Sequence, residues 1–100
     1  DDEYVSAQAA AIPSELHSKC IIAYEALSAI GTGNNMNPAH VAEVTDTIKE
    51  VFGDVRVLYG GSVTSSNVPE YAKISDGWLI GGASLTLENF WALLTAVSNL

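Results

Sequence analysis

The chain has 100 residues, enough for one small domain, and 48% of them are hydrophobic, which is ample for a core. Its formal net charge of -8 disfavours nucleic acid and anionic membranes as partners, although backbone N–H groups can hold a phosphate without Lys or Arg. The single cysteine excludes an internal disulfide, and no apolar run approaches the roughly 20 residues of a membrane span, so we expect a cytoplasmic protein.

The chain begins with the pattern of an amphipathic helix. Apolar residues recur at helical spacing between residues 4 and 16, namely Val5, Ala9, Ile12 and Leu16. A proline inside a helix removes a hydrogen bond and clashes with the preceding turn, so Pro13 should end this helix near Ile12. Ser14 should then begin a further turn.

Three apolar runs, each followed by a predicted helix, indicate an α/β fold with three parallel strands joined by right-handed crossovers. The runs are residues 20–24, 55–59 and 78–80. The first run is apolar throughout, so we expect both faces of that strand to be covered.

The helices that follow the strands have recognisable ends. Asn37 and Gly53 should cap a helix over residues 38–52, and Asn67 should cap a short helix that ends near Ile74. Thr86 should cap the last helix. One face of that helix is predicted to carry Leu87, Phe90, Leu94 and Val97, with Trp91 beside it.

Candidate chemistry lies after the strands. Glu25 ends the first strand, and Gly-Thr-Gly follows at residues 31–33. Glycine pairs, Gly60-Gly61 and Gly81-Gly82, end the other two strands. Single pairs often only make tight turns. Two pairs, each at a strand end, indicate a phosphate site, because glycine lets backbone N–H groups approach an anion.

Together these stretches resemble the triosephosphate isomerase family. Tyr24-Glu25 followed by Ala-Ile-Gly-Thr-Gly at residues 29–33 is similar to its catalytic-base strand and lid. Residues 58–63 and 79–85 are similar to two later motifs of the family, in the same order. The resemblance covers only the last three strand-helix units of the family's (β/α)8 TIM barrel. It implies that residues 1–100 are the C-terminal segment of one such domain, with the barrel incomplete in this chain.

The resemblance implies an enzyme of glycolysis and gluconeogenesis that interconverts dihydroxyacetone phosphate and D-glyceraldehyde 3-phosphate through an enediolate, with no cofactor or metal. Glu25 would be the base, and the hydroxyl of Tyr59 would support the closed lid. The substrate phosphate would be bound by Gly31, Ser62, Gly81 and Gly82. A complete member of the family would be a homodimer.

The sequence departs from the family at the stem of the lid. It has Ala26-Leu27-Ser28 where the family usually has Pro-Val-Trp. A lost proline loosens a hinge and a lost tryptophan removes packing, so we expect slower or less complete lid closure.

The chain also lacks a well-placed electrophile. Lys19, Arg56 and His17 precede strands, at the wrong end of a barrel, while the remaining basic residues, Lys49, Lys73 and His40, lie in helices. Three strands cannot close an eight-stranded barrel. We therefore expect the isolated chain to be inactive and to need a complementary N-terminal barrel portion. Two alternatives stay open: a non-catalytic phosphate-binding module, and a fragment that self-associates through its strand edges.

Overall fold

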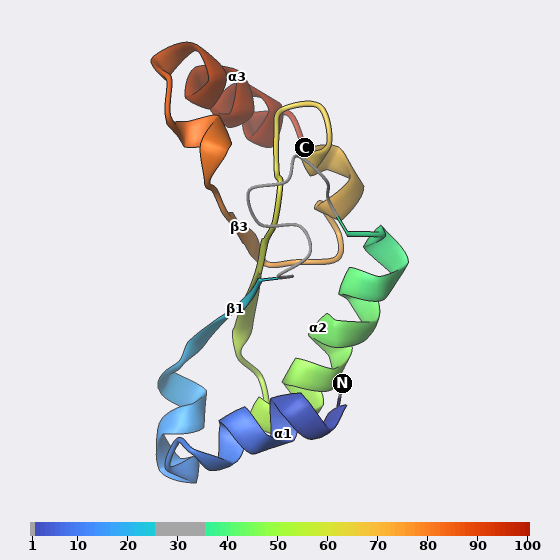
Figure 1. Ribbon diagram of the computed structural model, residues 1–100, viewed down its shortest axis with the longest axis vertical. Coiled ribbons are helices and arrows are strands. Elements are labelled where there is room, and N and C mark those ends of the chain that lie inside the picture. Colours follow the sequence, from blue (N-terminus) through green and yellow to red (C-terminus); the bar gives the residue numbers. More distant parts are fainter. Residues whose placement is uncertain (1, 26–35) are drawn as a thin grey trace.

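A three-stranded parallel sheet runs through the molecule (Figure 1). The computed structural model describes residues 2–25 and 36–100. The strands are β1 (Ile21–Glu25), β2 (Arg56–Gly60) and β3 (Gly77–Leu79), in the spatial order β1-β2-β3. Both pairings are parallel, and each strand lies within one residue of its predicted position. The predicted α/β fold with three parallel strands is confirmed.

The described part of the chain contains six helical segments. They are α1 (Asp2–Ala10), η1 (Ser14–Lys19), α2 (Pro38–Phe52), η2 (Val68–Tyr71), η3 (Gly82–Ser84) and α3 (Leu87–Ser98). The break between α1 and η1 falls at Pro13, as predicted. Over residues 2–25 and 36–100, no helix is long and apolar enough to cross a membrane.

Three of the four predicted caps are present. The Asn37 side chain accepts a hydrogen bond from the Ala39 N–H at 2.8 Å, and Thr86 caps α3 in the same way. Gly53 ends α2 with φ +92°, a left-handed conformation that favours glycine. The fourth prediction is confirmed only in position, and the helix ends at Tyr71 and not near Ile74. Asn67 precedes η2 but its side chain makes no cap bond there, because it bonds within the preceding loop.

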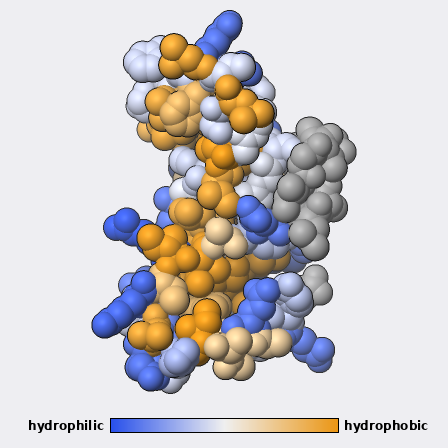
Figure 2. All heavy atoms as spheres, turned by 60° about the vertical axis from the view of Figure 1, so that its left-hand side comes forward, coloured by the Kyte–Doolittle hydropathy of each residue, from blue (hydrophilic) through white to orange (hydrophobic). Residues whose placement is uncertain are grey.

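The two faces of the sheet are covered differently. Val57 and Tyr59 of β2 are buried on the face that carries α2. On the opposite face Ile21 of β1 is 64% exposed and Leu79 of β3 is 43% exposed. Figure 2, with the left-hand side of Figure 1 turned forward, shows hydrophobic residues along the surface there. The expectation that both faces of the first strand are covered is therefore wrong for this chain, and we call this uncovered side the open face.

The core has two clusters, both on the helix-covered side. The upper cluster consists of Val41, Tyr59, Val63, Val68, Tyr71 and Leu93. The lower cluster consists of Ala9, Ile48, Phe52, Val55 and Val57. The long helix α2 contributes to both, so it fixes the two ends of the sheet relative to one another.

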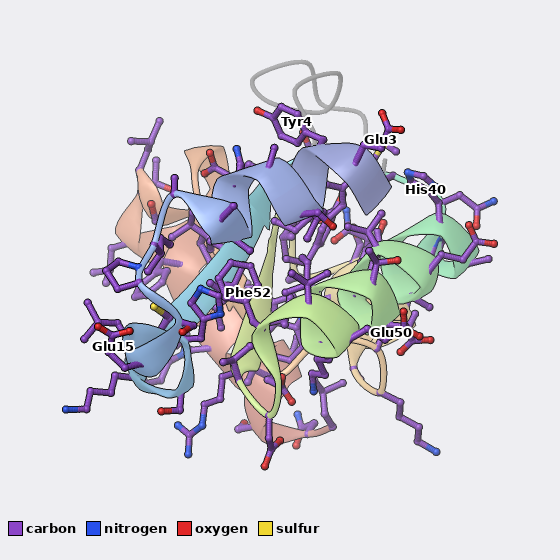
Figure 3. All side chains as sticks on the ribbon, turned by 90° about the horizontal axis from the view of Figure 1, so that it is seen from below. Glu3, Tyr4, Glu15, His40, Glu50 and Phe52 are labelled. Atoms are coloured by element: carbon purple, nitrogen blue, oxygen red, sulfur yellow. The ribbon has the colours of Figure 1, made fainter. Side chains whose placement is uncertain are left out.

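The lower end is closed by α1 and η1. The ring of His17 lies 4.8 Å from that of Phe52, which points inward beneath α1 (Figure 3). The Nε2 atom of His17 lies 3.0 Å from the carbonyl oxygens of both Ala9 and Ile12. Because both partners are acceptors, Nε2 carries a proton. His17 therefore satisfies carbonyl groups where α1 ends, far from the carboxyl edge of the sheet.

The packed face of α3 differs from the predicted one. Leu93 is buried, with Phe90 and Val97 packed against the same cluster. Leu87 is 83% exposed and Leu94 is 45% exposed. The prediction is therefore correct for Phe90 and Val97 and wrong for Leu87 and Leu94, because apolar residues occupy most sides of this helix and spacing alone does not select Leu93.

Asp76 ties β2, β3 and α2 together just before β3 begins. Its Oδ2 atom accepts a hydrogen bond from the Val57 N–H at 2.9 Å, and its own N–H donates to the Val57 carbonyl at 2.9 Å. The same oxygen lies 3.0 Å from Nζ of Lys49. The backbone bond from Val57, aided by Lys49 and Arg56, holds the pKa of the Asp76 carboxyl below its usual value against the opposing effect of desolvation.

We predict that Asp76→Asn lowers the free energy of unfolding at pH 7 by about 1 kcal/mol, a modest value because the side chain is partly exposed. A depressed folded-state pKa stabilises the fold above the unfolded-state pKa, and this stability is lost as the pH falls through the folded-state pKa, so the effect should shrink as the pH falls below about 4. Urea unfolding at pH 7 and pH 3 measures this. The exposed Asp46→Asn change is the control and should shift stability by less than about 0.5 kcal/mol. An equal loss for Asp76→Asn at both pH values would contradict the assignment.

Candidate active site

A pocket of about 560 Å³ opens at the carboxyl edge of the sheet. The parallel register places Glu25 beside Gly60, and Gly60 beside Leu79, so the three strand ends meet at one edge. The loops that follow β2 and β3 form the rest of the wall. Four residues singled out from the sequence line this one pocket: Glu25, Ser62, Gly81 and Gly82.

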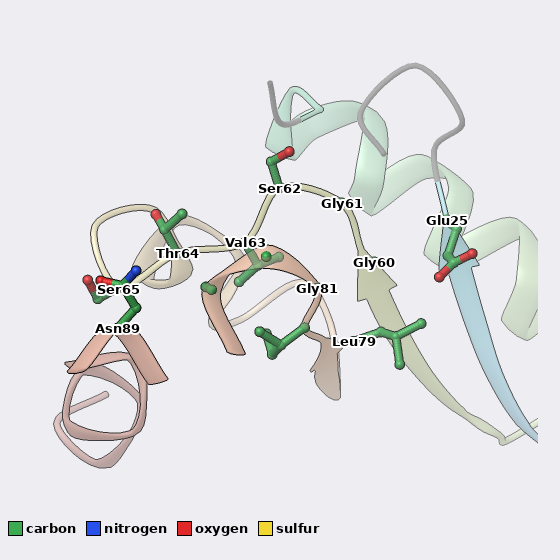
Figure 4. Close-up of a pocket in the computed structure, with 13 residues that line it drawn as sticks. Glu25, Gly60, Gly61, Ser62, Val63, Thr64, Ser65, Leu79, Gly81 and Asn89 are labelled. Atoms are coloured by element: carbon green, nitrogen blue, oxygen red, sulfur yellow. The ribbon is translucent and has the colours of Figure 1, made fainter. Parts of the chain in front are cut away.

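Glu25 is the last residue of β1 and is exposed on the open face. Its carboxylate points across the sheet edge toward β2 (Figure 4). Parallel strands deliver their last side chains to this edge, which explains why an acid that ends an apolar strand reaches the pocket. The predicted position of Glu25 at the carboxyl end of a strand is confirmed.

The loop after β2 is held by Asn67. The Oδ1 atom of Asn67 accepts from the Thr64 N–H at 2.8 Å, and its Nδ2 donates to the Ser62 carbonyl at 2.7 Å. These bonds fix the backbone of Ser62 and Thr64 along the pocket wall. The Ser62 side chain points away from Gly81 (Figure 4). Sequence reasoning missed this function of Asn67, although an Asn in a Ser/Thr-rich loop is a signal for such bonds.

The peptide between Gly81 and Gly82 is also fixed. Both the N–H and the hydroxyl of Ser84 donate to the Gly81 carbonyl, at 2.9 and 2.7 Å. In a trans peptide the N–H lies opposite the carbonyl, so the Gly82 N–H is directed away from η3. An added Cβ at Gly81 or Gly82 would meet nothing within 4 Å, so an incoming group can approach this backbone closely.

Two stacked tyrosines hold the backbone of Met36. The rings of Tyr59 and Tyr71 lie 4.5 Å apart. The Met36 N–H donates to the Tyr59 hydroxyl at 2.9 Å, and the Tyr71 hydroxyl donates to the Met36 carbonyl.

Burial, with a smaller contribution from Tyr59, raises the pKa of the neighbouring Tyr24, so that phenol is neutral near pH 7.

Among the described residues that line the pocket, none carries a basic side chain. Lys49 pairs with Asp76 before β3, and His17 contacts a carbonyl group near the end of α1. Across residues 2–25 and 36–100, no group of three His, Cys, Asp or Glu side chains could hold a metal ion. The predicted phosphate ligand Gly31 and the stem Ala26-Leu27-Ser28 lie outside the described residues.

A parallel strand-helix array with a carboxylate and glycine-rich loops at its carboxyl edge is typical of part of a (β/α)-barrel. The family is set by comparison with known proteins. The family model described as triosephosphate isomerase matches residues 2–97, so the chain belongs to the triosephosphate isomerase family.

Curated relatives agree with this assignment. The triosephosphate isomerase of Mesomycoplasma hyopneumoniae strain 7448 is 48% identical over 94 residues, which cover 90% of this chain and 39% of the relative. That of Flavobacterium johnsoniae is 41% identical over 97 residues, which cover 86% of this chain and 39% of the relative. That of Streptococcus thermophilus strain LMD-9 is 42% identical over 104 aligned residues, and the match covers 93% of this chain and 41% of the relative. The chain thus spans about two fifths of the length of these relatives.

We predict that Tyr59→Phe loosens Met36 while the ring stack on Tyr71 persists. Loss of one hydrogen bond of about 1 kcal/mol should make the Met36 amide exchange about fivefold faster. Hydrogen exchange followed by NMR measures this. Tyr4→Phe, at a side chain that is 65% exposed, is the control and should leave Met36 unchanged. An unchanged Met36 rate in Tyr59→Phe would show that the hydroxyl does not hold this residue.

Proposed function

We propose that this chain supplies the base and part of the phosphate-binding loops of a triosephosphate isomerase, which interconverts dihydroxyacetone phosphate and D-glyceraldehyde 3-phosphate. The observation that carries the proposal is the meeting of Glu25 with Ser62, Gly81 and Gly82 in one pocket. Membership of the family supports the reaction and the substrate.

The chemistry assigned to Glu25 is proton transfer. Its carboxylate takes a proton from the carbon next to the substrate carbonyl, and the electron pair of that C–H bond forms the enediolate. The proton of the hydroxyl on that carbon passes to the former carbonyl oxygen, and the protonated carboxyl then returns its proton to the former carbonyl carbon, which gives the isomeric product. Atoms and charge balance with no cofactor.

The substrate phosphate is assigned to backbone groups. The Gly82 N–H is held by the bonds from Ser84 to the neighbouring carbonyl, and no side chain crowds the approach. Ser62 contributes from the opposite loop, whose backbone Asn67 fixes. Backbone donors bind a phosphate without basic side chains, which suits a chain with net charge -8. Gly31 is proposed as a further donor, and Tyr59 as the support of the lid through Met36.

We propose that only a complete barrel catalyses the reaction. Enediolate formation needs an electrophile to stabilise the developing oxyanion, and no described pocket residue is basic. The sequence of residues 26–35 contains no Lys, Arg or His either. We therefore propose a complementary N-terminal barrel portion as partner, which covers the open face. The cytoplasmic location, the homodimer and the single-domain assignment of residues 1–100 stay predictions.

A second candidate function is a phosphate-binding module without catalysis. The absence of a basic side chain among the described lining residues favours it. The third alternative, self-association through strand edges, is consistent with β1 and β3, each of which pairs with only one strand in the described sheet.

We predict that Glu25→Gln strongly lowers turnover but keeps substrate binding. The test protein is a full-length chimera in which residues 1–100 replace the matching portion of the Mesomycoplasma hyopneumoniae relative. Removal of a general base should lower kcat by about 10² to 10⁴-fold, while KM changes by less than about threefold. A coupled isomerase assay measures both. If the chimera folds, shown by circular dichroism, but neither it nor the variant isomerises the substrate, the non-catalytic alternative holds.

We predict that Gly82→Ala in the same chimera weakens phosphate binding. The added Cβ meets no protein atom within 4 Å, so stability should be retained, while the methyl group blocks close approach of the phosphate. Loss of a hydrogen bond to a charged group should raise KM about tenfold or more. Steady-state kinetics give KM, and thermal unfolding gives stability. An unchanged KM would remove Gly82 from the phosphate site.

A further inference from the structure

The two glycine pairs at the pocket have different surroundings. A Cβ added at Gly81 or Gly82 would meet nothing within 4 Å. A Cβ added at Gly60 would lie 2.9 Å from Cγ of Glu25. One at Gly61 would lie 2.3 Å from the hydroxyl oxygen of Tyr59. The second pair therefore borders open space, whereas the first pair makes room for side chains of the protein itself.

Gly60 and Glu25 are neighbours across the sheet. They are register partners in the β1–β2 pairing, and both belong to the open face, where alternate residues of the strands lie. Gly60 is itself buried, while Glu25 is exposed. Figure 4 shows the Glu25 carboxylate pointing from β1 toward Gly60. The acid therefore lies across the backbone of β2.

An added methyl group at Gly60 could not be relieved cheaply. The atom it would meet is Cγ, in the middle of the Glu25 side chain, so relief requires rotation about χ1 and carries the carboxylate away. On the other side Cβ of Leu79 would lie 3.4 Å away, and that atom is fixed to the backbone of β3. A side chain at position 60 would thus be caught between two strands.

We propose that Gly60 is a positioning residue for Glu25: by lacking a side chain, it lets the carboxylate lie over β2 and point into the pocket. The inference rests on the proposed function of Glu25 as the base. The two glycine pairs then have different functions: Gly60 positions the Glu25 side chain, and Gly82 binds the substrate phosphate.

The test is Gly60→Ala in the full-length chimera. Displacement of the base by about 1 Å should lower kcat about a hundredfold, while KM changes by less than about threefold because the phosphate loops are untouched. Gly77→Ala is the matched control. It also adds a methyl group to the open face, but 2.8 Å from Cδ2 of Leu58, the far end of a flexible side chain, and it should keep kcat within about twofold.

A double-mutant cycle separates positioning from general damage. If Gly60 acts only through Glu25, Gly60→Ala should not lower the residual rate of Glu25→Gln further. If the two substitutions lower kcat independently, so that the double variant shows the product of the two separate fold-losses, the inference is wrong. A Gly60→Ala protein that fails to fold would also overturn it, because the inference places the change in the Glu25 side chain and leaves the sheet intact.

NMR gives a readout that needs no activity. In the unsubstituted protein, a nuclear Overhauser effect should join the Glu25 Hγ protons to the Gly60 Hα protons, and contacts of Glu25 to strand β2 should weaken in Gly60→Ala. An inactive unsubstituted chimera would reject the proposed function, whereas this contact would still test the geometry. An active chimera whose Gly60→Ala variant keeps its kcat would reject the inference alone.

Discussion

The parallel pairing of the three strands is the constraint on which the site depends. Its register places Glu25 beside Gly60 and Gly60 beside Leu79, so the strand ends and their loops converge on one edge. A slip by one residue would turn Glu25 to the face that α2 covers. The bonds between Asp76 and Val57 hold β3 to β2 at the other end of β3, so a contact outside the pocket also helps to set its geometry.

The two faces of the sheet carry different parts of the site. The covered face contains Tyr59 and Tyr71, whose hydroxyls hold the backbone of Met36. The open face contains Glu25, which lies across Gly60. The open face is also where the protein has exposed apolar strand residues and no described basic side chain at the pocket. The acid that we propose as the base therefore adjoins the side of the sheet that a complete barrel would cover.

Features set by local chemistry could be predicted from the sequence, and features set by packing could not. Pro13 and Asn37 fix helix ends by their own backbone and side-chain properties, and both predictions are confirmed. The packed face of α3 could not be predicted, because Leu93 and Leu94 are equally apolar and only the neighbouring cluster selects Leu93. Glycine pairs are ambiguous for a similar reason, since the sequence does not show whether a missing Cβ admits a ligand or a side chain.

We propose that this chain holds the base and the phosphate loops of an isomerase but needs the rest of the barrel for its electrophile. The most direct measurement is the isomerase activity of the purified 100-residue chain, alone and mixed with the remaining portion of the Mesomycoplasma hyopneumoniae relative. We predict no turnover by the chain alone and turnover in the mixture. Turnover of glyceraldehyde 3-phosphate by the chain alone would contradict the account.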